Sequence, residues 1–338
     1  MTKTRTLKIP RVFVTRRLPI EIETRMADLF DVVLRSDDSA LSQDELKAGI
    51  ADCDVFVPNV DDDINADVIA KAGPRLRLIA NFGAGTDHID RDQAYKRGII
   101  VTNTPGVLTE DTADLTMALI LSVPRRLAEG DRMMRAGTFK GWTPTHMLGS
   151  RVKGKALGIV GMGRIGQAVA RRANAFGLSV HYHNRRQVPA AIEDSLGAQY
   201  HADLDEMLGA VDILSLNCPF TPLTHHLINK DRLAHMKPEC FIVNTARGEV
   251  IDEAALADAL EAGQIGGAGL DVFENGAVPH AKLLTLDNVI LTPHIGSATH
   301  ESRREMGEKV LINIRALMDH HACPDRVLPP GKSFSLAS

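Results

Sequence analysis

Three segments of the chain carry groups suited to holding a small organic acid and moving a proton. Arg247 lies in "VNTARGEVID", His294 lies in "ILTPHIGSAT", and "NFGAGTDHID" contains a glycine-rich turn around Ala84 and Gly85. A guanidinium can bind a carboxylate and a carbonyl oxygen together, and an imidazole can transfer a proton near neutral pH. Backbone amides in a glycine-rich turn can hold an anion. Reduction of a 2-keto acid needs these groups, although each alone is also explained by a turn or a surface loop.

A second group of residues predicts a nucleotide site. Gly161, Gly163 and Gly166 in "GIVGMGRIGQAVARR" fit the pattern G-x-G-x-x-G. The pattern follows a strand-like run and opens a helical one, which is the context that makes it informative. Glycines there let the backbone approach a pyrophosphate at a helix N-terminus, where amide donors and the helix dipole favour anions. We therefore predict that the turn binds a dinucleotide, the alternative being a tight turn that serves packing alone.

The tip of the next strand bears on the choice of dinucleotide. In "SVHYHNRRQV" it carries Asn184, Arg185 and Arg186, where such folds usually have an Asp or Glu for the adenosine ribose. A carboxylate suits the free 2′-hydroxyl of NAD, whereas it repels the 2′-phosphate of NADP. Guanidinium groups form charge-assisted, often bidentate bonds to phosphate. The two arginines thus predict NADP(H) in preference to NAD(H), unless they belong to a solvated surface loop.

These residues need sheets to position them. Strand-like runs alternate with helix-length segments in two series, a pattern typical of doubly wound parallel sheets in α/β proteins. The first series comprises residues 11–16, 31–35, 54–59, 76–83 and 99–105, and the second 155–161, 179–184, 212–219, 240–246, 268–273 and 288–294. Arg247, His294 and the turn at Ala84 each follow a strand, at the sheet edge where open α/β folds bind ligands.

Two long helical stretches set the expected domain organisation. Residues 109–123 and 298–321 follow the two series, and the second stretch is expected to return the chain to the first domain. We therefore predict a discontinuous substrate domain, residues 1–105 plus 298–330, with a flavodoxin-like sheet. Residues 106–297 are predicted to form a Rossmann dinucleotide-binding domain, and residues 331–338 a weakly ordered tail.

Composition argues against several other classes of protein. The 338 residues are 44% hydrophobic and 24% charged with a net charge of −4, which gives no reason to expect nucleic acid or an anionic membrane as a partner. The apolar run 115–123 is too short to cross a bilayer, and the N-terminus has no secretory pattern. The four cysteines form no CxxC pair, so neither disulfides nor a metal site is expected. A cytoplasmic location is the default expectation.

Together these segments resemble the D-isomer-specific 2-hydroxy acid dehydrogenases, most closely their glyoxylate/hydroxypyruvate reductase branch. The resemblance spans roughly residues 10–325 and rests on motifs in the family's order. They are "GAGTDHID", "TNTPGVLTEDTADL", "GIVGMGRIGQAVARR", "HYHNRR", "NTARGEVID", "GAGLDVFEN" and "PHIGSAT". The resemblance implies an NADPH-dependent oxidoreductase that converts a small 2-keto acid, glyoxylate or hydroxypyruvate, to the D-2-hydroxy acid. It also implies a homodimer in which "GWTPTHML", residues 141–148, reaches over the partner.

The resemblance also assigns roles to individual residues. Arg247 would bind and polarise the keto acid, His294 would be the general acid/base, and the amides around Ala84 and Gly85 would hold the carboxylate. Asp271 would lie near the nicotinamide carboxamide. The cofactor-binding residues implied in this way are Gly161, Met162, Gly163, Arg164, Ile165, Gly166, Asn184, Arg185, Arg186, Cys218, Pro219, Thr245, Ala246, Arg247, Asp271, His294 and Gly296.

One position departs from the family pattern. Five residues after the aspartate of "LDVF" the family normally has a glutamate that pairs with the catalytic histidine, and here that position is Gly276. A carboxylate beside an imidazole raises its pKa and fixes its tautomer. The sequence leaves open whether Glu274, two residues upstream, takes over that role.

Three hypotheses about function follow. The first is an NADPH-dependent glyoxylate/hydroxypyruvate reductase. The second is a D-2-hydroxy acid dehydrogenase for a larger keto acid, and the third is a catalytically weak, dinucleotide-sensing binding protein of the same fold. The missing glutamate favours the third hypothesis, whereas Arg247, His294 and the glycine-rich turn oppose it. Turnover of NADPH with a panel of 2-keto acids distinguishes all three.

Overall fold

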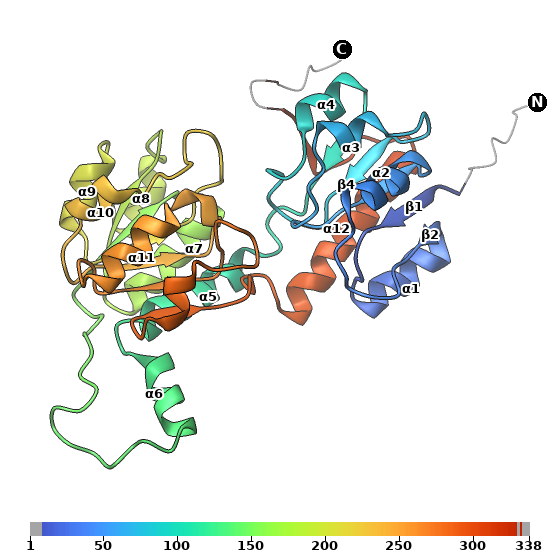
Figure 1. The fold of residues 1–338 in the computed structure, drawn as a ribbon. Coiled ribbons are helices and arrows are strands. Elements are labelled where there is room, and N and C mark those ends of the chain that lie inside the picture. The colour runs from blue at the N-terminus through green and yellow to red at the C-terminus, as the bar shows by residue number, and fades with distance from the viewer. Residues whose placement is uncertain (1–8, 330–331, 333–338) are drawn as a thin grey trace, which may run out of the picture. The chain divides into compact units, whose positions relative to one another are not determined.

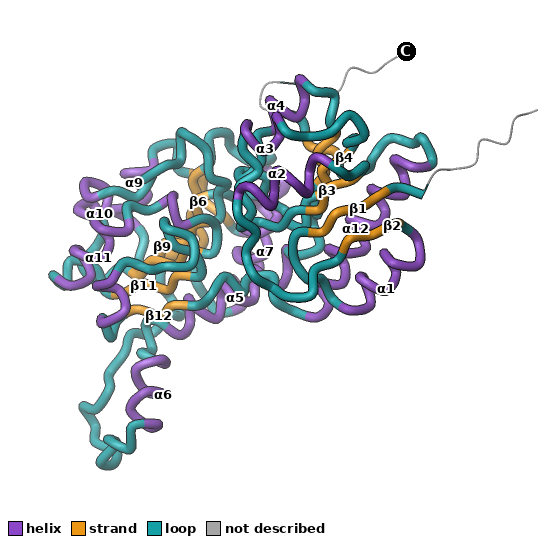
Figure 2. Tube along the Cα trace, turned by 45° about the vertical axis from the view of Figure 1, so that its right-hand side comes forward, coloured by secondary structure: helices purple, strands orange, loops and turns teal. Residues whose placement is uncertain are grey.

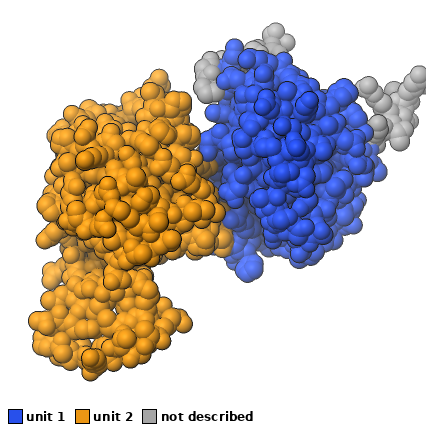
Figure 3. Space-filling model, viewed as in Figure 1, with its two compact units in different colours: residues 1–108, 299–338 blue, residues 109–298 orange. Residues whose placement is uncertain are grey.

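The computed structural model describes residues 9–329 and 332. The chain divides into two compact units, called unit 1 (residues 1–108 and 299–338) and unit 2 (residues 109–298), which Figure 3 shows in blue and orange. The predicted tail 331–338 lies outside the described residues, apart from Lys332. Within the described part of the chain, no helix is long and apolar enough to span a membrane.

Unit 1 is built on a six-stranded sheet in the order β13-β5-β4-β3-β1-β2. Its strands are β1 (Arg11–Val14), β2 (Asp31–Val33), β3 (Val55–Val57), β4 (Leu78–Ala80), β5 (Ile100–Thr102) and β13 (Arg326–Val327). The first five are parallel in the flavodoxin-like order 2-1-3-4-5, and β13 runs antiparallel to β5 at the edge. The helices are α1 (Ile20–Leu29), α2 (Gln43–Ala51), α3 (Ala66–Ala70), α4 (Arg91–Lys96) and α12 (His300–Met318) (Figure 1).

The core of unit 1 explains why the chain returns to it. Strands β3 and β4 are buried at every position, as expected for a parallel sheet with helices on both faces. One face packs against α1 and α12, through side chains such as Ile22, Met306 and Ile314. Because α12 supplies part of this apolar layer, the unit would lose a core element without the C-terminal segment.

Unit 2 contains a seven-stranded parallel sheet in the order β12-β11-β10-β9-β6-β7-β8. Its strands are β6 (Ala156–Val160), β7 (Ser179–His183), β8 (Ala198–Tyr200), β9 (Ile213–Leu216), β10 (Phe241–Asn244), β11 (Gly267–Leu270) and β12 (Val289–Leu291). Figure 2 shows several of them in orange. Counted from β6, the order is 3-2-1-4-5-6 with one added strand, which is the Rossmann arrangement. Together the two sheets confirm the predicted α/β fold class.

The helices of unit 2 cover its sheet, with one exception. They are α5 (Thr109–Ser122), α6 (Leu127–Arg135), α7 (Arg164–Ala175), α8 (Ala190–Leu196), α9 (Leu204–Ala210), α10 (Lys230–His235) and α11 (Glu253–Glu261), with 3-10 turns η1 (Gly248–Val250) and η2 (Ala281–Thr285). Helix α6 has no buried residue, and Figure 1 shows it on an arm that extends from the rest of the unit. We call residues 126–148 the arm.

Candidate functional site

The turn between β6 and α7 has the geometry of a phosphate cradle. Gly161 has a φ of 101°, and a Cβ added there would lie 2.7 Å from backbone atoms of Asn217 and Cys218. Gly163 is the N-cap of α7, where an added Cβ would meet no atom within 4 Å. The turn thus leaves open space before the free amides of a twelve-residue helix, and this space fits a phosphate group.

The turn lies at the switch point of the sheet. β6 pairs with both β7 and β9, so the loops that follow β6 and β9 leave the carboxyl edge side by side. The loop after β9 carries Cys218 and Pro219. Burial raises the pKa of the Cys218 thiol to about 11, so this group stays neutral and any role it has at the site is one of shape. Open α/β folds bind their ligands at this place.

The tip of β7 is positively charged. The side-chain Oδ1 of Asn184 accepts a hydrogen bond from the Met162 amide at 2.8 Å, which ties the tip to the glycine turn. Arg185 and Arg186 follow and are exposed. The nearby carboxylate of Glu193 accepts hydrogen bonds from the Tyr182 hydroxyl at 2.5 Å and from Gln187 Nε2 at 3.0 Å. Because the Glu193 carboxylate is bonded to these neutral side chains, the positive charge of the tip is that of Arg185 and Arg186, beside the predicted phosphate cradle.

Arg247 is positioned by a residue that the sequence analysis did not single out. The side chain of Asn244, only 1% exposed, accepts a hydrogen bond from the Ala246 amide at 3.0 Å and donates one to the Arg247 carbonyl at 2.8 Å. Arg247 itself is half-buried, and its Nη1 donates to the Ala246 carbonyl at 2.8 Å. Asn244 could have been predicted from the sequence as a positioning residue, because it is a polar residue at the end of an otherwise apolar strand.

Hydrogen bonds to Asp271 fix the conformation of the loop that carries His294. Its carboxylate, 1% exposed, accepts hydrogen bonds from Thr292 Oγ1 at 2.7 Å, from the Ile295 amide at 2.8 Å and from the Gly296 amide at 2.9 Å. His294 has a left-handed backbone with a φ of 55°, and its amide donates to the Asp271 carbonyl at 2.9 Å. The residue that the resemblance places near the nicotinamide is therefore also the anchor of the histidine loop.

The carboxylate of Glu274 is engaged by other groups. Its Oε1 lies 2.5 Å from His226 Nε2, and its Oε2 accepts a hydrogen bond from the Glu253 amide at 3.3 Å. Gly276 is exposed, with a φ of 65°, and an added Cβ would meet nothing within 4 Å. The structure thus gives Glu274 a partnership with His226 that the sequence did not suggest.

In unit 1 the glycine-rich turn after β4 is held by two asparagines. The Nδ2 of Asn81 donates to the carbonyls of Gly83 at 3.0 Å and Gly85 at 2.7 Å, and the Nδ2 of Asn103 donates to the carbonyl of Ala84 at 2.6 Å. With three successive carbonyls bonded to side chains, the turn has a fixed backbone. Neither asparagine was singled out from the sequence, because the motif drew attention to the glycines.

The predicted residues fall into two groups. Those of unit 2 follow β6, β7, β9, β10, β11 and β12 and share the carboxyl edge of one sheet. Thr245 also meets α5, because its Oγ1 lies 2.8 Å from the Oγ1 of Thr116. Ala84 and Gly85 belong to unit 1, just beyond the end of β4.

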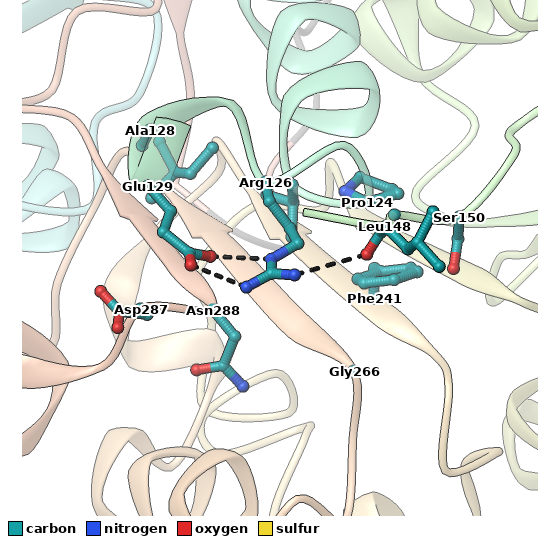
Figure 4. Close-up of a pocket in the computed structure, with 13 residues that line it drawn as sticks. Pro124, Arg126, Ala128, Glu129, Leu148, Ser150, Phe241, Gly266, Asp287 and Asn288 are labelled. Carbon is teal, nitrogen blue, oxygen red and sulfur yellow. Dashed lines mark hydrogen bonds and ion pairs between the residues drawn. The ribbon is translucent and has the colours of Figure 1, made fainter. Parts of the chain in front are cut away.

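A cavity of about 410 Å³ lies elsewhere in unit 2. Phe241, Gly266 and Asn288 line it, and they stand at or just before the starts of β10, β11 and β12. Figure 4 shows Arg126 there, between Glu129 and the carbonyl of Leu148. Because the cavity opens at the amino edge of the sheet, opposite the predicted cofactor turn, we do not assign it to the dinucleotide.

The sequence matches the profile described as "D-isomer specific 2-hydroxyacid dehydrogenase, NAD binding domain" over residues 117–296. The glyoxylate reductase of Thermococcus litoralis is 44% identical over 322 residues, covering 94% of this chain and 96% of that protein. The glyoxylate reductase of Korarchaeum cryptofilum is 44% identical over 333 residues, covering 95% of this chain and 99% of that protein.

Solved structures show the same similarity. A putative D-isomer specific 2-hydroxyacid dehydrogenase from Polaromonas sp. JS6 66 matches with a TM-score of 0.88 at 39% identity, covering 95% of this chain and 100% of that one. An NADPH-dependent glyoxylate/hydroxypyruvate reductase from Sinorhizobium meliloti, in complex with NADP and malonate, matches with a TM-score of 0.84 at 35% identity. That match covers 95% of this chain and 97% of the other.

Proposed function

This chain belongs to the D-isomer-specific 2-hydroxyacid dehydrogenases, and from that membership we propose that it reduces a small 2-keto acid, glyoxylate or hydroxypyruvate, with NADPH to the D-2-hydroxy acid. One observation carries the proposal: the phosphate cradle, the arginine-bearing tip, Arg247 and His294 follow parallel strands of one sheet and share its carboxyl edge. The names of the relatives, glyoxylate reductases, and the NADP in one similar structure support it.

The cofactor assignment follows from charge and open space. When bound, the nicotinamide dinucleotide would supply the hydride that adds to the keto carbon. The turn from Gly161 to Gly166 would hold the pyrophosphate on the amides at the start of α7. Arg185 and Arg186 would bind the 2′-phosphate, which a carboxylate at the same tip would repel.

The reacting oxygen needs a proton and a cation beside it. Arg247 would bind the substrate carboxylate and polarise the carbonyl with its planar guanidinium, while the amides of Ala84 and Gly85 are assigned to the carboxylate. His294, in its protonated form, would donate its proton to the carbonyl oxygen, giving the hydroxyl of the product. Asn244 and Asp271 are positioning residues, because they fix the turn of Arg247 and the loop of His294 through hydrogen bonds.

We also propose that the chain forms a homodimer through the arm. Five large apolar side chains of the arm are exposed: Leu127, Met134, Phe139, Trp142 and Leu148. Several large apolar side chains exposed on one segment favour an interaction surface, because contact with water disfavours them.

Turnover tests the proposed activity. The purified protein should oxidise NADPH with glyoxylate and hydroxypyruvate at a higher kcat/KM than with pyruvate or phenylpyruvate. Phenylpyruvate as the best substrate would favour a dehydrogenase of larger keto acids. Binding of NADPH without turnover of any of the four acids would favour the dinucleotide-sensing protein.

Arg247→Lys tests the assigned substrate residue. The change keeps the charge and removes the planar fork, so most of the kcat/KM should be lost. Retention of kcat/KM in a folded Arg247→Lys protein would contradict the role given to Arg247.

A further inference from the structure

A cluster of metal-binding side chains lies in unit 2 on segments distant in the sequence. It consists of His225 and His226, in the loop between β9 and α10, and Glu274, in the loop after β11. One donor atom from each side chain lies within 4.8 Å of the other two. The closest pair, His226 Nε2 and Glu274 Oε1, is 2.5 Å apart. We call these three residues the His–His–Glu cluster.

The backbone brings two adjacent histidines to the same side. His225 and His226 lie in a turn rather than in an extended segment. His226 has a φ of 46°, and its ring stacks on that of His225 with centroids 4.0 Å apart. A left-handed backbone at a residue with a Cβ costs conformational free energy, so the surrounding structure must hold it.

Hydrogen bonds fix both sides of the cluster. The amides of His225 and His226 donate to the carbonyls of Thr221 at 3.0 Å and Glu249 at 2.8 Å. On the other side, the amide of Glu274 donates to Glu253 Oε2 at 2.7 Å, and Glu253 is only 6% exposed. Hydrogen bonds therefore fix the backbone of both segments that carry the three side chains.

The donor set and the spacing point to a metal ion. We propose that His225, His226 and Glu274 bind a divalent first-row transition-metal ion such as Zn²⁺, with water completing its coordination. Zinc lies about 2.1 Å from nitrogen and oxygen ligands, which places tetrahedral ligands about 3.4 Å apart. Binding therefore requires the two stacked imidazoles, whose planes are 18° apart, to turn about their side-chain bonds until a nitrogen lone pair of each points at the ion. Imidazole favours zinc and its neighbours in the series, whereas Mg²⁺ and Ca²⁺ prefer oxygen ligands.

An ion pair between His226 and Glu274 would not by itself explain the cluster. Such a pair needs one histidine, whereas the structure also stacks His225 on its neighbour and sets it edge-on to Phe220, with ring centroids 6.0 Å apart. A bound ion would join the loop after β9 to the segment after β11, and so it should stabilise unit 2. Binding is measured without cofactor or substrate, so its outcome is separate from that of the proposed activity.

The chain contains a matched control. His320 and His321 form a second adjacent pair at the end of α12; both are exposed, and His320 has a φ of 59°. Within the described residues, the His–His–Glu cluster is the group of three such side chains that meets the spacing for a metal. The double variant His320→Ala/His321→Ala therefore removes two histidines without touching the cluster.

The experiment is a calorimetric titration of tag-free, chelator-treated protein with ZnCl₂, accompanied by thermal unfolding with and without Zn²⁺. We expect one ion per chain and a rise in Tm on binding. His225→Ala and Glu274→Gln should each weaken the affinity about tenfold or more and abolish the rise in Tm. The His320→Ala/His321→Ala control should bind like the wild type, and MgCl₂ should give no binding.

His225 is exposed, so His225→Ala leaves the core intact and keeps the test valid even if Glu274→Gln is unstable. The proposal is overturned if the wild type binds no Zn²⁺, if His225→Ala binds Zn²⁺ as tightly as the wild type, or if Mg²⁺ binds equally well. It is also overturned if the loss of binding occurs in the His320→Ala/His321→Ala control.

Discussion

At the scale of single residues, Arg185 and Arg186 are the source of the proposed cofactor preference. Both are exposed at the tip of β7, and Asn184 links that tip to the glycine turn. A hydrogen bond to a charged group contributes roughly 1.5–3 kcal/mol, so Arg185→Ala/Arg186→Ala should raise the KM for NADPH about tenfold or more. The KM for NADH should change little, because NADH has no 2′-phosphate for the arginines to bind.

A separate control is needed to show that the effect on KM comes from the two arginines at the tip and not from the loss of any positive charge. Arg171 is an exposed arginine of α7 that pairs with Glu110 at 3.1 Å, so Arg171→Ala removes one positive charge away from the tip. This variant should leave the ratio of the two KM values unchanged. Equal increases in both KM values for the double variant would mean that the tip does not select the cofactor.

Gly276 stands where the family pattern has a glutamate, so a carboxylate introduced there tests whether this position acts on His294. Its φ of 65° means that any side chain there carries a left-handed strain of about 1–2 kcal/mol, while the space for a side chain is open. Gly276→Ala and Gly276→Glu share this strain, and only the second adds a carboxylate. A carboxylate beside His294 would raise its pKa, so Gly276→Glu should keep its reductive activity to higher pH than Gly276→Ala.

The measurement is kcat/KM for keto acid reduction across the neutral range in both variants. Superimposable pH profiles from two folded proteins would show that position 276 no longer reaches the histidine. Glu274 is not an equivalent substitute in this test, because its carboxylate is already bonded to His226 and to the amide of Glu253.

The sequence points more readily to the residues proposed to carry chemistry than to those that hold them in place. Arg247 and His294 stand out because they are polar groups in motifs at strand ends. Asn244, Asn81 and the pair His226–Glu274 do not stand out, because their roles come from contacts between segments far apart in the chain. The His–His–Glu cluster likewise forms from segments far apart in the chain, so the spacing of residues along the sequence gives no sign of it.

At the scale of elements, the buried strands were predictable and the exposed elements were not. All eleven predicted strand-like runs overlap strands of the structure, because parallel strands covered on both faces appear as short apolar runs. The predicted runs extend one to three residues too far where polar loop residues continue the pattern, as at 212–219 against Ile213–Leu216. β8, β13 and α6 were not predicted, since they are short or lack a buried face.

The contact between β7 and the end of β8 predicts a dependence of stability on pH. His181 Nδ1 lies 3.0 Å from His201 Nε2, and burial, with the charges of His201 and Lys237, lowers the pKa of His181 below its ordinary 6.5, while Asp212 opposes the shift. The unfolded chain therefore binds a proton more readily than the folded one. The neutral His181 therefore contributes to the free energy of unfolding in full above about pH 6.5, and this contribution is lost as the pH falls towards the pKa of His181 in the folded protein.

His181→Gln removes this titration and keeps a polar side chain. Between pH 8 and pH 5 the Tm of the wild type should fall more than that of His181→Gln. His300→Gln, at the exposed first position of α12, is the control and should retain the wild-type pH dependence. Parallel pH curves for wild type and His181→Gln would mean that the histidine pair does not contribute.

At the scale of the whole molecule, the arm stands out because none of its residues is buried. Trp142 is 80% exposed, Leu148 66%, and Leu127 and Met134 61% each. Yet hydrogen bonds join the two ends of the arm. Arg126 donates two hydrogen bonds to Glu129, at 2.8 and 2.7 Å, and its Nη1 donates to the Leu148 carbonyl at 3.5 Å. Because the arm has hydrogen-bonded ends and still exposes aromatic and aliphatic side chains, we expect a second copy of the chain to cover these side chains.

We therefore expect light scattering coupled to size exclusion to give twice the chain mass of 36.7 kDa for the wild type. Met134→Glu/Trp142→Glu should give one chain mass, because burying two carboxylates in an apolar interface costs more than the contacts return. Ile20→Glu introduces a carboxylate at an equally exposed apolar position, 65% exposed at the start of α1, and should remain dimeric. A monomeric wild type, or a dimeric Met134→Glu/Trp142→Glu protein, would contradict assembly through the arm.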